Sequence, residues 1–302
     1  MPVPGRFGAV ICAMVTPFDD DDRLDIPGAV KLARWLVDNG NDGLVLAGTT
    51  GEAPALSDQE KRTLWKAVRE VVGVPLIANT GTASTAHSVE LTKMAADIGA
   101  DGALVVTPYY NRPSQAGIEA HFRAIAAATD LPVIAYDIPK RTGRELRAPT
   151  LARLAGDGVL AGLKDASGST AATAALIETA PPSFEVYSGE DALTLPLLAV
   201  GAVGIISVAS HWAGPQISEM IAAYSKGDTE AAMALNARLI ESWDFEGSDD
   251  APNPVPTKAM LRALGLPAGE CRLPMGPTPA GLAERAREVW GNLHSQAFRQ
   301  AV

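Results

Sequence analysis

Cysteine is scarce in this sequence, and long apolar runs are missing. Only Cys12 and Cys271 occur among 302 residues, and their wide separation fits neither a metal-binding motif nor a disulfide framework. So few cysteines are typical of a protein from a reducing compartment. No run approaches the roughly 18 apolar residues of a membrane span. We therefore expect neither a disulfide-stabilised secreted domain nor an integral membrane protein.

One apolar segment, residues 8–15, follows Arg6 and is similar to the apolar region of a short targeting signal. It runs into Thr16 and Pro17 and then into four aspartates, and it lacks the small-residue pattern of a signal cleavage site. We interpret it as a first β-strand and expect a cytoplasmic protein.

Basic side chains are also in short supply. Lysine and arginine number 25 against 35 aspartates and glutamates, which gives a formal net charge of −10. An acidic surface repels phosphate backbones and anionic lipids, so we expect neither nucleic acid nor a membrane surface as a partner. Hydrophobic residues make up 47% of the chain, which is enough for a large core. The length suits one (β/α)8 barrel with an appendage, or two medium domains.

Apolar runs of strand length alternate with helical patterns eight times along the chain. The runs are continuous rather than alternating, which predicts a parallel sheet covered by helices. Eight units favour a closed TIM barrel. A doubly wound open sheet is the alternative, but no Gly-x-Gly-x-x-Gly motif follows an early strand. The expected strands cover residues 9–15, 43–47, 75–78, 102–106, 132–136, 159–164, 184–187 and 203–208.

Beyond Pro215 the pattern becomes helical, and no further strand is expected. The periodicity predicts helices over 216–225, 229–243, 257–264 and 279–293, the last with Thr278 as its N-cap and Pro279 in its first turn. We therefore divide the chain into a catalytic barrel over residues 1–226 and a C-terminal helical region over residues 227–302.

A single lysine, Lys164, stands at the end of the sixth apolar run. Most lysines at such a position extend to water, because desolvation disfavours the charged amine. The same desolvation lowers the pKa of an amine that stays buried, which is what attack on a carbonyl to form a Schiff base requires. The neighbouring residues decide between these two interpretations.

Active sites of barrels lie at the carboxyl ends of the strands. At these ends the sequence offers many hydroxyls and one amine, but no histidine cluster and no reactive cysteine, so metal-dependent hydrolysis and thiol chemistry lack their residues. The turn over residues 48–52, which contains Thr49 and Thr50, could hold a carboxylate, although Gly/Thr turns are common. Tyr136 ends the strand before that of Lys164, and neighbouring strands lie about 4.8 Å apart, so the phenol and the amine can meet.

Three motifs resemble the signatures of the dihydrodipicolinate synthase / N-acetylneuraminate lyase family. They are the Gly-Thr-Thr-Gly-Glu turn at 48–52, the segment Tyr136-Asp137-Ile138-Pro139-Lys140-Arg141-Thr142-Gly143 and the segment Gly162-Leu163-Lys164-Asp165. Residues 107–114, 253–256 and 272–275 look like the synthase branch, as do Thr49 and Arg141, which the lyase branch usually replaces. The match covers about residues 8–280 in the order of the family.

The resemblance implies a Schiff base between pyruvate and Lys164, with no cofactor and no metal. The carboxylate of pyruvate would rest on Thr49, Thr50 and their amides. Tyr136, Thr50 and a Tyr110 lent by a neighbouring subunit would relay protons.

Three further residues complete the implied site. Arg141 would hold the carboxylate of the second substrate, aspartate semialdehyde, and Gly189 and Ile206 would also contact substrate. The product would be 4-hydroxy-tetrahydrodipicolinate, in lysine and diaminopimelate biosynthesis. The chain would act as a homotetramer.

Two alternatives remain open at this point. One is another pyruvate-dependent aldolase or sugar-acid dehydratase of the same family. The other is a non-catalytic barrel that binds a 2-oxo acid, which would not need the amine. Asn79 stands where the family pattern leads us to expect glycine, and it would alter the pocket floor.

The resemblance also bears on regulation. In feedback-inhibited members of the synthase branch, lysine binds at the dimer contact through histidines, an asparagine, a glutamate and a tyrosine. The corresponding positions here are Asp58, Lys61, Ala83, His87 and Tyr109, so only the tyrosine is kept. We therefore expect little or no inhibition by lysine.

Overall fold

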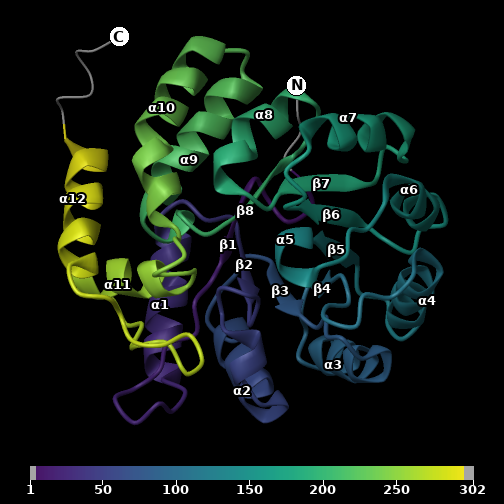
Figure 1. The fold of residues 1–302 in the computed structure, drawn as a ribbon, viewed down its shortest axis with the longest axis horizontal. Coiled ribbons are helices and arrows are strands. Elements are labelled where there is room, and N and C mark those ends of the chain that lie inside the picture. Colours follow the sequence, from purple (N-terminus) through teal and green to yellow (C-terminus); the bar gives the residue numbers. More distant parts are fainter. Residues whose placement is uncertain (1–4, 296–302) are drawn as a thin grey trace.

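Eight parallel strands form a closed barrel in the computed structural model, which describes residues 5–295 (Figure 1). Each strand pairs with its sequence neighbours, and β8 closes the ring by pairing with β1. The predicted TIM barrel is thus confirmed, and the open sheet is excluded. The strands are β1 Val10–Ala13, β2 Gly43–Leu46, β3 Leu76–Asn79, β4 Gly102–Val106, β5 Val133–Asp137, β6 Gly162–Asp165, β7 Glu185–Ser188 and β8 Gly204–Ser207.

Helices connect the strands and cover the outside of the barrel (Figure 1). Ser57 caps α2 together with Glu60 in the predicted capping box, in which each side chain accepts a backbone N–H of the other residue. The helices and short 3-10 turns of the barrel are α1 Ile26–Asp38, η1 Ala53–Ala55, α2 Asp58–Arg69, α3 Thr85–Asp97, α4 Gln115–Ala126, α5 Pro139–Thr142, α6 Ala148–Gly156, α7 Thr170–Thr179, η2 Asp191–Leu193 and α8 Thr194–Ala199.

Four of the strands, β1, β2, β6 and β8, are shorter than the apolar runs that predict them. Val159 and Leu160 belong to the sixth run, but they precede β6 and pack with the helices outside the barrel. Inward-facing side chains from around the ring fill the barrel interior instead, as in other barrels of this size. This inner cluster contains Phe7, Ile11, Ala13, Val45, Ile77, Leu104, Val106, Ile134, Tyr136, Ala166, Tyr187 and Ile206.

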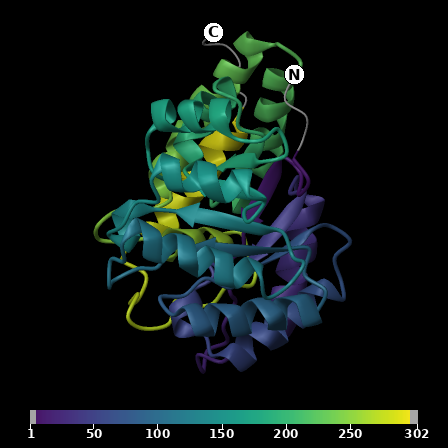
Figure 2. The ribbon, with the colours of Figure 1, turned by 90° about the vertical axis from the view of Figure 1, so that its right-hand side faces the viewer.

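Four helices follow β8 and gather along one side of the barrel (Figure 1). In the view of Figure 2, α12 (yellow) lies behind the teal helices of the barrel. The helices are α9 Ser210–Ser225, α10 Thr229–Phe245, α11 Val255–Ala263 and α12 Leu282–His294. Among residues 5–295, none of the helices has the length and apolar character needed to cross a membrane. The division of the chain at residue 226 stays a prediction.

Two predicted helix starts in this region are wrong. The first helix begins at Ser210 rather than at 216, because a departure from helical geometry at Ala213 absorbs the break that Pro215 would cause. The last helix begins at Leu282, after Gly281 in the left-handed region (φ 84°). Thr278 does not cap it, because its hydroxyl donates to the Glu270 carboxylate at 2.6 Å.

Candidate active site

Lys164 and Tyr136 lie side by side at the carboxyl end of the barrel. The two residues are register partners on β6 and β5, so their side chains leave the sheet at the same level. The Lys164 Nζ atom lies 4.3 Å from the centroid of the Tyr136 ring. Both residues are buried, at 5% exposure. The lysine therefore does not extend to water, as most strand-end lysines do.

Burial lowers the pKa of the Lys164 amine to about 8, because desolvation disfavours its charged form. The carboxyl groups of Asp191 and Glu246 act against this shift, and the Arg141 guanidinium acts with it. At pH 7 roughly a tenth of such an amine is neutral. Lys164 can therefore act as a nucleophile near neutral pH.

Tyr136 keeps its proton at neutral pH. Burial raises the pKa of its phenol to about 12, and the Arg141 guanidinium and the Thr49 side chain act in the opposite direction. A protonated phenol next to a partly neutral amine can donate a proton to a group that reacts with that amine.

Two acids near Lys164, the buried Asp191 and the partly buried Glu246, were not predicted as site residues. The Asp191 carboxylate accepts the hydroxyl of Ser207 and the backbone N–H of Val208, the latter at 2.9 Å, and burial raises its pKa to about 6. Glu246 follows α10, and burial raises the pKa of its carboxyl well above the usual range. Asp191 stands in the segment after β7, and its place at a strand end is a local signal for it. Nothing local marks Glu246, which lies some 80 residues beyond Lys164 in the chain.

Gly189 and Ile206 also lie at the barrel interior. A Cβ atom at Gly189 would come within 2.9 Å of Lys164 Cγ, so only glycine leaves room for the lysine side chain. Ile206 on β8 is fully buried in the inner cluster.

The turn after β2 presents free backbone donors. Among residues 5–295, the backbone amides of Thr49 and Thr50 donate no hydrogen bond to another residue. Glu52, which ends the turn, has left-handed backbone angles (φ 56°), and Thr16 donates to the carbonyl oxygen of Gly51 at 2.7 Å. Adjacent free amides and hydroxyls in such a turn suit a carboxylate.

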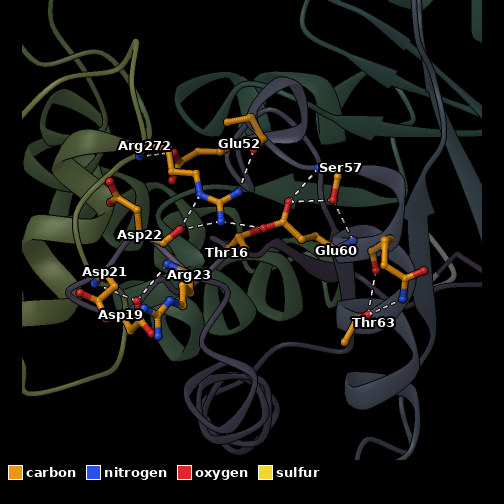
Figure 3. A network of polar contacts seen from close by, with 12 residues as sticks. Thr16, Asp19, Asp21, Asp22, Arg23, Glu52, Ser57, Glu60, Thr63 and Arg272 are labelled. Carbon is orange, nitrogen blue, oxygen red and sulfur yellow. Dashed lines mark hydrogen bonds and ion pairs between the residues drawn. The ribbon is translucent and has the colours of Figure 1, made fainter.

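The C-terminal helical region holds this turn in place (Figure 3). Lys258 on α11 forms a fully buried ion pair with Glu52, with 2.6 Å between Nζ and Oε1. The backbone N–H of Arg272 donates to the second oxygen of Glu52 at 2.8 Å. Asn253 donates from Nδ2 to the Thr50 hydroxyl at 2.9 Å. None of these contacts follows from a local sequence pattern.

Arg272 extends the same network toward α2 (Figure 3). Its guanidinium donates to Glu60 at 2.6 Å and to the carbonyl oxygens of Asp22 and Ala55. The hydrogen bond from Arg272 holds the pKa of the Glu60 carboxyl at about 2, below its usual range.

A cavity of about 770 Å³ opens beside the buried pair. Thr49 and Arg141 line it, and Asn79 contributes to its wall. Lys164 and Tyr136 are not among the residues that line it. Tyr110 also lines the cavity, but it is 92% exposed and has left-handed backbone angles (φ 72°). Of the predicted site residues, Tyr110 and Arg141 are therefore the exposed ones.

The closed barrel and the buried lysine at the carboxyl end of β6 define a (β/α)8-barrel enzyme. A sequence model of the dihydrodipicolinate synthetase family matches residues 6–289, so the chain belongs to that family.

Characterised relatives and solved structures agree with this assignment. The chain is 50% identical over 272 residues to the 4-hydroxy-tetrahydrodipicolinate synthase of Moorella thermoacetica. This alignment covers 89% of this chain and 92% of the relative. A dihydrodipicolinate synthase of Bacillus anthracis superposes with a TM-score of 0.91 at 42% identity, over 95% of this chain and 98% of the other. The synthase of Cyanidioschyzon merolae, solved with lysine bound, gives 0.92 at 42% identity, over 96% and 99%.

Proposed function

We propose that this protein is a lyase that condenses pyruvate with L-aspartate 4-semialdehyde to 4-hydroxy-tetrahydrodipicolinate, in lysine and diaminopimelate biosynthesis. The observation that carries the proposal is the buried Lys164 amine, with its pKa lowered to about 8, beside the protonated Tyr136 phenol. Membership of the family and the names of its relatives support the choice of reaction.

Lys164 starts the reaction. Its neutral amine attacks the carbonyl carbon of pyruvate, a C–N bond forms, and the former carbonyl oxygen leaves as water once it has been protonated. The imine that results withdraws electrons from the methyl group, which loses a proton and becomes an enamine. No cofactor is needed, because the imine itself accepts the electron pair.

The enamine carbon then attacks the aldehyde carbon of the second substrate, and a C–C bond forms. The aldehyde oxygen takes a proton, which Tyr136 supplies through the relay with Thr50 and the Tyr110 of a neighbouring subunit. The amine of the second substrate closes the ring by attack on the imine carbon and releases Lys164.

The carboxylates of the two substrates have separate positions in this proposal. Thr49 and Thr50 hold the carboxylate of pyruvate with their hydroxyls and free amides. Arg141, which lines the cavity, holds the carboxylate of aspartate semialdehyde with its fork of N–H donors. Gly189 and Ile206 bound the space around the pyruvate methyl group.

Assembly and location are part of the same proposal. The exposed Tyr110 supports a homotetramer in which each subunit completes the relay of its neighbour. We place the enzyme in the cytoplasm, a reducing compartment in keeping with its two cysteines.

Trapping with borohydride tests the proposal directly. Incubation with pyruvate and borohydride should leave one reduced adduct, on the peptide that contains Lys164. Lys61 and Lys258 are also buried and serve as internal controls for reaction at buried amines. An adduct on either of them, or no adduct, would contradict the mechanism. Turnover that requires aspartate semialdehyde rather than a sugar acid then distinguishes this reaction from others in the family.

A further inference from the structure

Asn253 connects the C-terminal helical region to the Thr50 hydroxyl. Its Nδ2 atom donates to Thr50 Oγ1 at 2.9 Å, and its Oδ1 atom accepts from Thr257 Oγ1 at 3.2 Å. Thr257 lies on α11 and is fully buried, and Thr50 is 3% exposed. The three side chains therefore form a chain of hydrogen bonds with two buried ends and a partly buried Asn253 between them, and it ends at the turn after β2.

The direction of these hydrogen bonds has a chemical consequence. A threonine hydroxyl has one hydrogen to donate and two lone pairs that accept. Because Thr50 accepts from Asn253, its own hydrogen stays available for a different acceptor. If the amide were reversed, its Oδ1 atom would face Thr50. Thr50 would then donate its hydrogen to Asn253, and that hydrogen would not be available to the reacting groups.

We propose that Asn253 is a positioning residue that makes Thr50 a hydrogen-bond donor toward the reacting groups, with the Thr257 hydroxyl holding the other end of the amide in place. The proposal rests on the proposed function, in which Thr50 exchanges protons with Tyr136 and substrate. In this proposal the C-terminal helical region, through Asn253 and Thr257, determines that Thr50 donates its proton rather than accepts one.

Asn253→Asp tests this assignment, because a carboxylate has no hydrogen to donate. Thr50 must then donate to residue 253, and kcat should fall at least about tenfold near pH 8, the size expected for a hydrogen bond to a charged group. The KM for pyruvate should change less. At lower pH the protonated acid regains an O–H donor, so the ratio of variant to wild-type kcat should rise as the pH falls. If the Asn253→Asp variant kept the wild-type kcat at pH 8, the proposal would be wrong. A carboxylate can only accept from Thr50, so an unchanged rate would mean that Thr50 need not accept a hydrogen bond from residue 253.

Asn39→Asp is the matched control. Asn39 also donates from Nδ2, to the carbonyl oxygen of Trp35 at 2.7 Å, but it follows α1 at the opposite end of the barrel. Its relative kcat should not depend on pH. If it showed the same pH dependence as Asn253→Asp, the effect would come from added charge, and the proposal would be wrong.

Thr257 provides a second pair of variants should Asn253→Asp fail to fold. Thr257→Val keeps the shape but removes the hydroxyl that holds the amide, so kcat should fall by about two- to tenfold. Thr257→Ser keeps the hydroxyl and should restore most of the rate. Equal rates in all three proteins would overturn the role of Thr257 and the chain of hydrogen bonds with it.

Borohydride trapping of pyruvate on wild-type Lys164 separates the two possible failures. Without an adduct in the wild type, the proposed function fails and the inference fails with it. With an adduct and normal turnover in the wild type, an unaffected Asn253→Asp variant refutes only the inference.

Discussion

The phenol of Tyr136 remains protonated far above neutral pH, so its removal takes away a proton donor rather than a charge. We expect Tyr136→Phe to lower kcat by about 10² to 10⁴, as for loss of a general acid–base, with a smaller change in the KM for pyruvate. Tyr187→Phe is the control, since it removes another buried phenol, one that donates to Glu185 at 2.8 Å. Equal losses of kcat in the two variants, measured by steady-state kinetics, would contradict the role of Tyr136.

Arg141 should fail in a different way. Because its guanidinium is assigned to the second substrate, Arg141→Ala should raise the KM for aspartate semialdehyde and leave imine formation with pyruvate intact. Arg144→Ala is the neighbouring control, since that side chain donates to the carbonyl oxygen of Arg112 instead. An unchanged KM and kcat/KM for the aldehyde in Arg141→Ala would show that the assignment is wrong.

The Lys164 amine also sets a pH dependence. Its pKa of about 8 means that the reactive neutral form increases as the pH rises through that value. The rate of imine formation at low pyruvate concentration should therefore rise between about pH 6 and 9 and then level off. Rapid-quench trapping with borohydride measures this rate, and a profile that is flat across that range would contradict the lowered pKa.

Asp58, Lys61 and His87 bear on inhibition by lysine. Asp58 is already paired with His87 at 2.9 Å and lies 3.9 Å from the buried amine of Lys61, and all three line the large cavity. A lysine ligand would find no free acid there for its α-ammonium, and loss of such a charge partner costs about 2 to 5 kcal/mol. We expect no half-inhibition by sub-millimolar L-lysine at saturating pyruvate. Half-inhibition in that range would mean that Asp58 exchanges its partners for the ligand.

At the scale of elements, the turn after β2 and helix α11 depend on one buried ion pair. Removal of one partner leaves the other charge buried without compensation, so Glu52→Gln and Lys258→Met should each destabilise the protein by about 3 to 5 kcal/mol. The double variant should lose less than the sum of the two. Chemical denaturation measures the free energy of unfolding, and additive losses would mean that the pair is not coupled.

The elements show where sequence reasoning succeeds and where it ends. Apolar runs mark the eight strands because a parallel barrel buries both faces of each strand, and Lys164 stands out because a charge interrupts such a run. Contacts between distant segments leave no local pattern. The start of α12 was mispredicted because Thr278 bonds to Glu270, and Asn253 could not be placed on Thr50 without the fold.

At the scale of the whole molecule, the proposed relay needs the Tyr110 of a second chain. Tyr110 is 92% exposed, and both Tyr110 and Arg112 have left-handed backbone angles. We expect the active form to be at least a dimer, and Tyr110→Ala to lower kcat without loss of the barrel. Sedimentation at assay concentrations, together with activity, provides the measurement. Fully active monomers would contradict the shared relay.

The contact between Asn253 and Thr50 also has a consequence for the newly made chain. The two residues are 203 positions apart, and Lys258 and Arg272 are made later still. At about 5 to 20 residues per second, the ribosome delivers Asn253 roughly 10 to 40 seconds after Thr50. During that interval all eight strands can already have left the ribosome, while the turn after β2 still lacks its contacts with Asn253, Lys258 and Arg272. The nascent barrel should therefore remain inactive until the last sixth of the chain has been translated.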